Sequence, residues 1–153
     1  MITRLTQLPL ISLVLSLGVF NISAVAQTAP QPEMTVYKSP TCGCCKKWIS
    51  HLEKNGFKVT AHDVESVMPY KVKNKITPEL ASCHTAKING YTIEGHVPAK
   101  DILRLLKEKA KVSGLAVPGM PVGSPGMEMG NRKDNYDVVS FDNKGKQEVF
   151  SSY

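Results

Sequence analysis

The chain has 153 residues, of which 42% are hydrophobic, and this size is typical of one small globular domain. Its formal net charge is +6, but the 19 basic residues are interspersed with 13 acidic ones. No basic stripe alternates with aromatic side chains, so the sequence argues against nucleic-acid binding and indicates a solvated basic surface.

The chain begins with the three parts of a secretory signal peptide. Arg4 supplies the positive charge, residues 8–20 are mainly apolar, and Ala24 and Ala26 place small residues where a signal peptidase cleaves. The apolar run is short for a helix that spans a bilayer. We therefore predict a signal peptide over residues 1–26, export with cleavage, and no membrane attachment after cleavage.

The next segment predicts a leader and the start of a folded domain. Residues 27–33 are polar with two prolines, so we expect a flexible leader. Residues 34–153 are expected to form a single domain. Its first strand is predicted over residues 34–37, which are β-prone.

A helix is predicted after this strand, because four side chains recur with the spacing of one helical face: Cys45, Trp48, Ile49 and Leu52. The pair Asn55-Gly56 ends the pattern, and residues 57–64 predict a second strand. The cysteines in residues 42–45 are therefore expected where the first strand turns into the first helix.

The second half of the chain predicts two helices, two hairpins and a loop. The turn Asn89-Gly90 is typical of a β-hairpin, and Pro98 is favourable in the first turn of a helix. In chain order we expect a short helix within 65–80, strands over 85–88 and 91–97, a helix from Pro98 to Gly114, a Pro/Gly/Met-rich loop over 115–130, and strands over 136–141 and 146–151.

This order of elements is the layout of a thioredoxin. A strand leads into a helix that carries cysteines, and a hairpin and a further helix follow. A C-x-x-C motif near a βαβ pattern points the same way. The predicted fold class is α/β, a thioredoxin-like fold with an added C-terminal β-hairpin.

All four cysteines follow the predicted cleavage site. In an exported protein they indicate disulfides first, which can pair in three ways. However, three of the four crowd into residues 42–45, and neighbours such as Cys44 and Cys45 bond to each other only with strain. Crowded thiols at a helix N-terminus, where the helix field favours thiolate, indicate a functional site instead.

The donor types favour copper. Thiolates select Cu(I), zinc or iron–sulfur clusters, but zinc usually takes two separated C-x-x-C pairs, and here the second half is only Cys83 with His84. The predicted loop contains Met120, Met127 and Met129, whose thioethers are soft ligands suited to Cu(I). Packing on the core is an equal alternative for Met120 and Met127, and it is the favoured one for Met129.

Two stretches resemble redox enzymes of the thioredoxin fold. The thioredoxin active site is similar to residues 41–46, Thr-Cys-Gly-Cys-Cys-Lys, with Cys44 in the place of proline. The hairpin and last helix of glutaredoxins are similar to residues 88–95 and 101–103. This resemblance places the cis-proline of those enzymes at His84, directly after Cys83.

The chain also resembles the CopG-type periplasmic copper-resistance proteins over roughly residues 34–150. The motifs that carry this resemblance are, in order, 37–45 (YKSPTCGCC), 82–85 (SCHT), 94–98 (EGHVP) and 117–128 (VPGMPVGSPGME). The resemblance implies a thioredoxin-like fold, export, copper binding and redox handling of the metal. Copper ions and other periplasmic copper-handling proteins would be the partners.

We therefore predict a Cu(I) centre, mononuclear or multinuclear. The expected metal ligands are Cys42, Cys44, Cys45, Cys83, His84, Met120 and Met127. A hydrogen-bonding role is an equal alternative for His84, and the roles of His96 and Met129 stay open. His51 and His62 are expected at the surface.

Two other functions stay open. In a thiol–disulfide oxidoreductase, Cys42 would be the nucleophile and Cys45 the resolving thiol, but the missing proline and the two surplus thiols argue against this function. A domain held together by two structural disulfides is the third hypothesis. Whether the chain is an enzyme also stays open, with copper oxidoreductase as the candidate activity.

Overall fold

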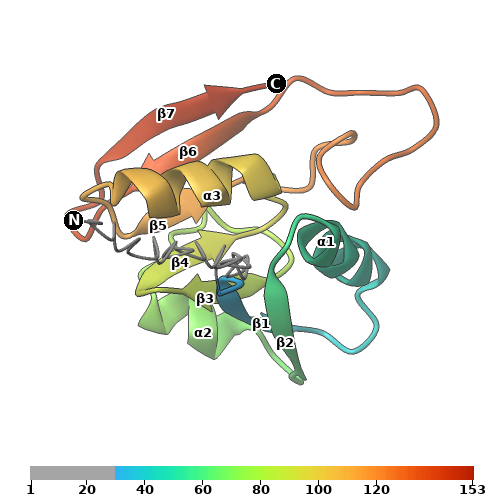
Figure 1. Cartoon of the computed structure of the whole chain (residues 1–153), viewed down its shortest axis with the longest axis horizontal. Helices are drawn as coiled ribbons and strands as arrows, with labels where there is room; N and C mark the ends of the chain where they lie inside the picture. Colours follow the sequence, from blue (N-terminus) through green and yellow to red (C-terminus); the bar gives the residue numbers. More distant parts are fainter. Residues whose placement is uncertain (1–29) are drawn as a thin grey trace, which may run out of the picture.

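The computed structural model describes residues 30–153, and the predicted signal peptide lies outside this range. Its elements are arranged around one sheet (Figure 1). The strands are β1 (Glu33–Lys38), β2 (Lys58–Asp63), β3 (Thr85–Ile88), β4 (Tyr91–Glu94), β5 (Gly114–Ala116), β6 (Asp137–Phe141) and β7 (Gln147–Ser152). The helices are α1 (Gly43–Lys54), α2 (Met68–Lys73) and α3 (Ala99–Glu108).

The sheet has seven strands in the order β2-β1-β3-β4-β5-β6-β7. The pairs β1/β2 and β4/β5 are parallel, and the other neighbours are antiparallel. Both parallel pairs are joined by a helical crossover, α1 in the first and α3 in the second. Within the described range, no helix combines the length and the apolar character that a membrane crossing requires.

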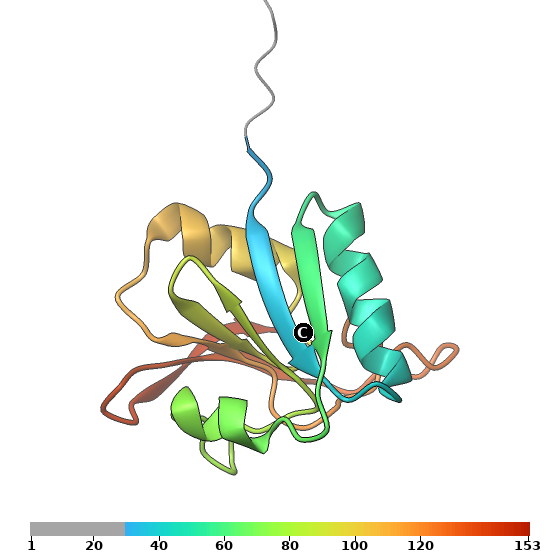
Figure 2. The same cartoon turned by 90° about the horizontal axis from the view of Figure 1, so that it is seen from below.

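Helices α1 and α3 cover one face of the sheet, and α2 lies against the other (Figures 1 and 2). The main core lies under the first pair of helices, where Trp48 and Leu52 of α1 meet Ile102 and Leu105 of α3. All four side chains are fully buried, and burial of each stabilises the fold by about 1.5–3 kcal/mol. The core thus fixes α1 against the sheet, with its N-terminus beside the end of β1.

The fold confirms the order of the predicted elements and adds a strand. Residues 114–116 were expected to end a helix and begin a loop, but they form β5 between β4 and β6. Gly114 allows this pairing, because a Cβ there would overlap the carbonyl oxygen of Thr92. The predicted C-terminal hairpin is present as β6 and β7, and β5 joins it to the rest of the sheet.

The strand predicted over residues 91–97 is shorter than expected. It ends at Glu94, because Gly95 has a φ of +70° and turns the chain out of the ladder. The residues up to Pro98, which caps α3, form a tight connection in which the Val97 N–H donates to the carbonyl oxygen of Gly95. This turn directs residues 95–98 across the end of α1.

Candidate metal centre

The first helix begins at the cysteine motif. Cys42 is the N-cap of α1, and its Sγ accepts a hydrogen bond from the Cys45 backbone N–H at 3.3 Å. A sulfur in the cap position takes up a donor that the first turn leaves unsatisfied. The helix has no acidic side chain in its first turn, so no carboxylate of that turn competes with the Cys42 sulfur for the positive end of the helix dipole.

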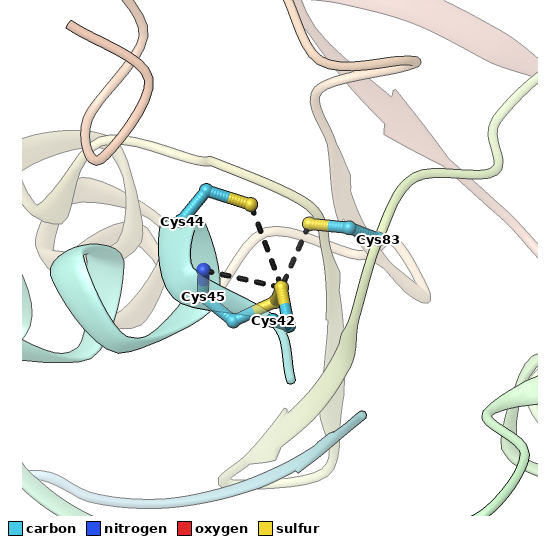
Figure 3. A group of neighbouring side chains, drawn as sticks. All are labelled: Cys42, Cys44, Cys45 and Cys83. Atoms are coloured by element: carbon cyan, nitrogen blue, oxygen red, sulfur yellow. Dashed lines mark hydrogen bonds between the residues drawn. A yellow bond between two sulfur atoms is a disulfide. The ribbon is translucent and has the colours of Figure 1, made fainter. Parts of the chain in front are cut away.

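The four cysteine sulfurs lie within 4.8 Å of one another (Figure 3). Cys42 and Cys45 form a disulfide, with their Cα atoms 5.3 Å apart. Cys44 and Cys83 are free thiols. The Sγ atoms of Cys42 and Cys44 are 3.4 Å apart, and those of Cys45 and Cys83 are 3.6 Å apart.

Cys83 reaches the helix from a remote part of the chain, as the sequence predicts. It precedes β3, and the next residue, His84, is held by a hydrogen bond from the Gly95 N–H to its carbonyl oxygen at 3.0 Å. Burial raises the pKa of the Cys83 thiol, and the neighbouring Cys44 raises it further. Cys83 is therefore protonated at neutral pH unless a cation lies beside it.

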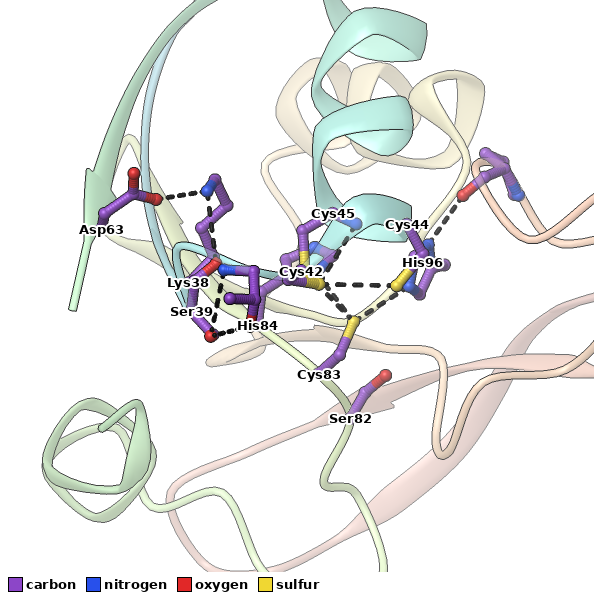
Figure 4. The surroundings of a disulfide bond; sticks show 12 residues. Lys38, Ser39, Cys42, Cys44, Cys45, Asp63, Ser82, Cys83, His84 and His96 are labelled. Carbon is purple, nitrogen blue, oxygen red and sulfur yellow. Dashed lines mark hydrogen bonds and ion pairs between the residues drawn. A yellow bond between two sulfur atoms is a disulfide. The ribbon is translucent and has the colours of Figure 1, made fainter. Parts of the chain in front are cut away.

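Two buried imidazoles flank Cys83 (Figure 4). Nδ1 of His84 lies 3.1 Å from the Cys83 Sγ, and Nε2 of His96 lies 2.9 Å from it. The Nδ1 of His96 is 2.7 Å from the carbonyl oxygen of Pro125, which only accepts, so Nδ1 carries the proton and the Nε2 lone pair faces the sulfur. Burial lowers the pKa of both imidazoles, which keeps them neutral and able to ligate a metal.

His84 also contacts the core. Its ring centroid lies 4.2 Å from that of Trp48, and its buried Nε2 has no hydrogen-bond partner in the described part of the chain. The sequence left a ligand and a hydrogen-bonding residue as equal alternatives for His84. The side chain faces Cys83 through Nδ1, the same atom that a metal bound to Cys83 would meet.

The methionine loop packs against the same end of α1. Gly126 has a φ of +87°, and a Cβ there would lie 2.7 Å from the carbonyl oxygen of Cys44 and 2.8 Å from the backbone nitrogen of Trp48. Met127, the next residue, is half-buried. Met120 and Met129 are 53% and 60% exposed, so of the three methionines Met127 is the least exposed to solvent.

The other two histidines have different surroundings. His62 is exposed and stacks on Tyr37 with ring centroids 5.4 Å apart, as expected of a surface residue. His51 was also expected at the surface, but it is half-buried, and its Nε2 accepts a hydrogen bond from the Ala99 N–H at 3.1 Å. This contact caps α3 with a side chain of α1, and burial lowers the pKa of His51.

Sequence reasoning left His96 unassigned, although the predicted hairpin contains the information that places it. The register pairs Ile88 with Tyr91 and Thr85 with Glu94. If this antiparallel register is continued by two residues beyond the Thr85–Glu94 pair, Cys83 lies opposite His96. A strong Asn-Gly turn therefore fixes which histidine faces the remote cysteine.

The group as a whole offers soft and borderline donors to a metal. Four sulfurs and two imidazole nitrogens converge, and the Cys83 Sγ belongs to both the sulfur group and the Cys83–His84–His96 group. Thiolate and imidazole together suit copper and zinc, and a larger share of sulfur favours Cu(I). The hydrogen bond from the His96 Nδ1–H to the Pro125 carbonyl oxygen is of the kind that orients metal-bound imidazoles.

The chain is similar to one described protein family and to solved structures of other proteins. Residues 80–127 match a family described as "Protein of unknown function, DUF411". Two solved structures, described as forms 1 and 2 of the copper resistance protein CopG, are similar with 50% and 49% identity. Each alignment covers 80% of this chain and 98% of the other, with a TM-score of 0.77.

No curated protein matches the chain. The two solved structures nevertheless align with nearly their whole length, at an identity that leaves no doubt about common descent. The residues of the cysteine motif, Cys83 and the imidazoles all lie in the part of the chain described here. The chain belongs to the CopG family of copper-resistance proteins.

Proposed function

We propose that this protein is an exported copper-binding protein of copper resistance, which holds Cu(I) on the thiolates of Cys42, Cys44, Cys45 and Cys83. The convergence of these four sulfurs within 4.8 Å is the observation that carries the proposal. The similar structures, described as copper resistance proteins, support copper as the metal.

The sulfur arrangement supports more than one bound ion. Four thiolates so close together repel one another, and bridging cations relieve that repulsion. The raised pKa of Cys83 means that its thiol must lose its proton when it becomes a ligand, so Cu(I) binding releases a proton there and weakens at low pH. His84 and His96 complete the site on the Cys83 side, and Met127 is the better placed of the two predicted methionine ligands.

The disulfide supports a redox role for the same site. Reduction of the Cys42–Cys45 disulfide supplies two further thiols, and their oxidation returns two electrons and two protons. Two Cu(II) ions that accept these two electrons become two Cu(I) ions. Oxidation of one dithiol to the disulfide therefore supplies the electrons that reduce two copper ions. We propose that the protein interconverts Cu(I) and Cu(II) in this way.

Anaerobic titration of the reduced, exported protein with Cu(I), against a competing chelator, tests the proposal. We expect tight binding that is lost in the double variant Cys42→Ser with Cys83→Ser. The exposed neighbour Thr41 provides a matched control, because Thr41→Ser leaves every sulfur in place. Cu(I) binding that the double variant retains would refute the proposed site. A separate measurement, the mass of the exported protein, would show whether cleavage occurs after Ala26.

The fold supports a thioredoxin-like core, which we infer for strands β2-β1-β3-β4 with helices α1, α2 and α3. This part has α1 and α3 on one face and α2 on the other (Figure 2). We propose that residues 1–26 are a signal peptide and that residues 27–33 are a leader. The single domain then covers residues 34–153. The proposed compartment is the periplasm.

A thiol–disulfide oxidoreductase is the second candidate, and the Cys42–Cys45 disulfide at the N-terminus of α1 favours it. This function predicts that the metal-free protein reduces or isomerises a disulfide substrate at a rate comparable to a thioredoxin. Copper handling predicts negligible turnover in the same assay. The assay on the metal-free protein therefore separates the two functions.

A further inference from the structure

The residue before Gly95 in the EGHVP motif has no part in the site described above. Glu94 is the last residue of β4, and its side chain is fully buried on the face opposite the main core. Its carboxylate accepts hydrogen bonds from the Ser82 backbone N–H at 2.7 Å, from the Thr85 hydroxyl at 2.7 Å and from the Lys71 ammonium.

Two of these three donors flank Cys83 and His84. Ser82 precedes the pair and Thr85 follows it, so the two oxygens of one carboxylate hold the segment on both sides. The backbone adds a further tie, because the Gly95 N–H donates to the His84 carbonyl oxygen at 3.0 Å. The segment that carries Cys83 is thus fixed at three places, Ser82, His84 and Thr85, by residues 94 and 95.

Gly95 makes this close approach sterically feasible. It has a φ of +70°, and a Cβ there would lie 2.6 Å from the Val117 carbonyl oxygen and would also overlap the side chain of Ser82. Only glycine therefore lets the chain turn at this point while Ser82 remains within reach of the Glu94 carboxylate.

Lys71 of α2 supplies the positive charge that the buried carboxylate needs. Its ammonium also donates to the Thr85 hydroxyl at 3.3 Å, and the side chains of Lys71 and Glu94 are 5% and 0% exposed. A buried ion pair contributes little net stability, because desolvation of the two charges offsets their attraction. Its hydrogen bonds, however, set the geometry of the groups that they join.

We propose that Glu94 is a positioning residue, whose carboxylate holds the Cys83 segment so that the Cys83 thiol faces the cysteines of α1. Glu94 contacts none of the sulfurs and acts through Ser82 and Thr85. The inference rests on the proposed function in that the positioned thiol is a copper ligand. Carboxylates that orient the ligands of a metal in this way alter metal affinity about 10- to 100-fold.

The position of Cys83 can be measured without copper. With the Cys42–Cys45 disulfide intact, Cys44 and Cys83 are the free thiols, and dibromobimane bridges two thiols only when they are close. We expect Glu94→Gln to lower the ratio of bridged to singly labelled protein about tenfold, since it removes the charge from the hydrogen bonds that hold Ser82 and Thr85. We also expect the reduced variant to bind Cu(I) about 10- to 100-fold more weakly.

The control is Glu148→Gln, because Glu148 is exposed and forms an ion pair with Lys146 at 2.6 Å. A folded Glu94→Gln protein with the bridging ratio and Cu(I) affinity of this control would overturn the proposal. If circular dichroism shows that Glu94→Gln does not fold, Thr85→Val takes its place, since it removes one donor and keeps the carboxylate. We expect a decrease of about threefold in the bridging ratio for that variant, and an unchanged ratio overturns the proposal.

The two measurements separate this inference from the proposed function. A lower bridging ratio in Glu94→Gln, with no Cu(I) binding even in the wild type, supports the positioning of Cys83 and refutes copper binding. Tight Cu(I) binding in both proteins with equal bridging ratios supports copper binding and overturns the positioning role.

Discussion

At the scale of single residues, the imidazole of His96 links the sulfur group to the methionine loop. Its Nδ1–H donates to the Pro125 carbonyl oxygen, so its Nε2 lone pair is aimed at Cys83 without any further adjustment. Because the imidazole is already neutral and oriented, its side chain loses little conformational entropy when the metal binds. This residue therefore provides a direct test of how far the site extends beyond sulfur.

We predict that His96→Gln weakens Cu(I) binding about tenfold, because the amide does not reproduce the lone pair that faces Cys83. Competition titration of the reduced protein would measure the change. His62→Gln is the control, since His62 is exposed and stacks on the half-buried ring of Tyr37. Equal affinities for the two variants would exclude His96 from the ligand set.

Substitution can also distinguish a methionine that binds copper from one that does not. We predict that Met127→Leu lowers Cu(I) affinity by about tenfold through loss of a soft thioether, while Met129→Leu, at a position that is 60% exposed, leaves it unchanged. X-ray absorption at the copper edge would show the loss of one sulfur neighbour in the first variant only. If neither variant loses a sulfur neighbour of copper, Met127 is not a ligand and its role is to pack against the core.

The predicted ligands show how far sequence reasoning reaches at this scale. The contact of Cys83 with α1 was predictable, because a C-x-C-C motif at a helix start and a remote cysteine before a hairpin have few other roles. The half-buried position of His51 was not, since its partner is the backbone of Ala99 in a different helix. Such contacts depend on how α1 and α3 pack, which a local pattern does not encode.

At the scale of elements, the predictions succeeded where the pattern is local. The apolar face of α1 and the Asn-Gly turn between β3 and β4 are both readable within a few residues. Strand β5 was wrongly assigned to a loop, because three residues, Gly-Leu-Ala, carry no periodicity. Its structure comes from pairing with β4 and β6, which are remote in the sequence.

The packing of the methionine loop on α1 gives a prediction at this scale. Gly126→Ala should lower the free energy of unfolding by about 1–3 kcal/mol, because its Cβ would approach the backbone of Cys44 and Trp48 and the φ is positive. Urea unfolding of the variant and the wild type would measure this change in the free energy of unfolding.

Gly130→Ala is the matched control for that substitution. Its φ is also positive, at +58°, but a Cβ there meets open space. The difference between the two variants thus isolates packing from backbone strain, and equal losses would show that the loop does not depend on its contact with the helix.

At the scale of the whole molecule, three partly or fully buried histidines make stability depend on pH. Burial lowers the pKa of His51, His84 and His96 below the usual value of 6.5. The unfolded chain therefore takes up protons that the folded state does not bind as the pH falls below 6.5. The stability that these neutral imidazoles contribute is complete above this pH and is lost below it.

We predict that the metal-free protein is less stable at pH 5.5 than at pH 7.5, with His84 contributing about 1 kcal/mol of the decrease and the more exposed His51 less. Between pH 7.5 and pH 8.5 the histidines should cause no further change, and stability should fall slightly, because the raised pKa of Cys83 means that the unfolded chain loses this thiol proton first. Urea unfolding at these three pH values measures the effect. A stability that rises toward pH 5.5 would contradict the assignment of neutral imidazoles.

The close contact between the rings of Trp48 and His84 has a practical consequence. Trp48 is the single tryptophan of the chain, and its ring centroid lies 4.2 Å from that of His84. Its indole N–H is tied to the Val97 carbonyl oxygen at 2.9 Å, so the ring has a fixed orientation. Tryptophan fluorescence therefore arises from one defined place beside the sulfur group, and its quenching would report occupancy of the site without a label.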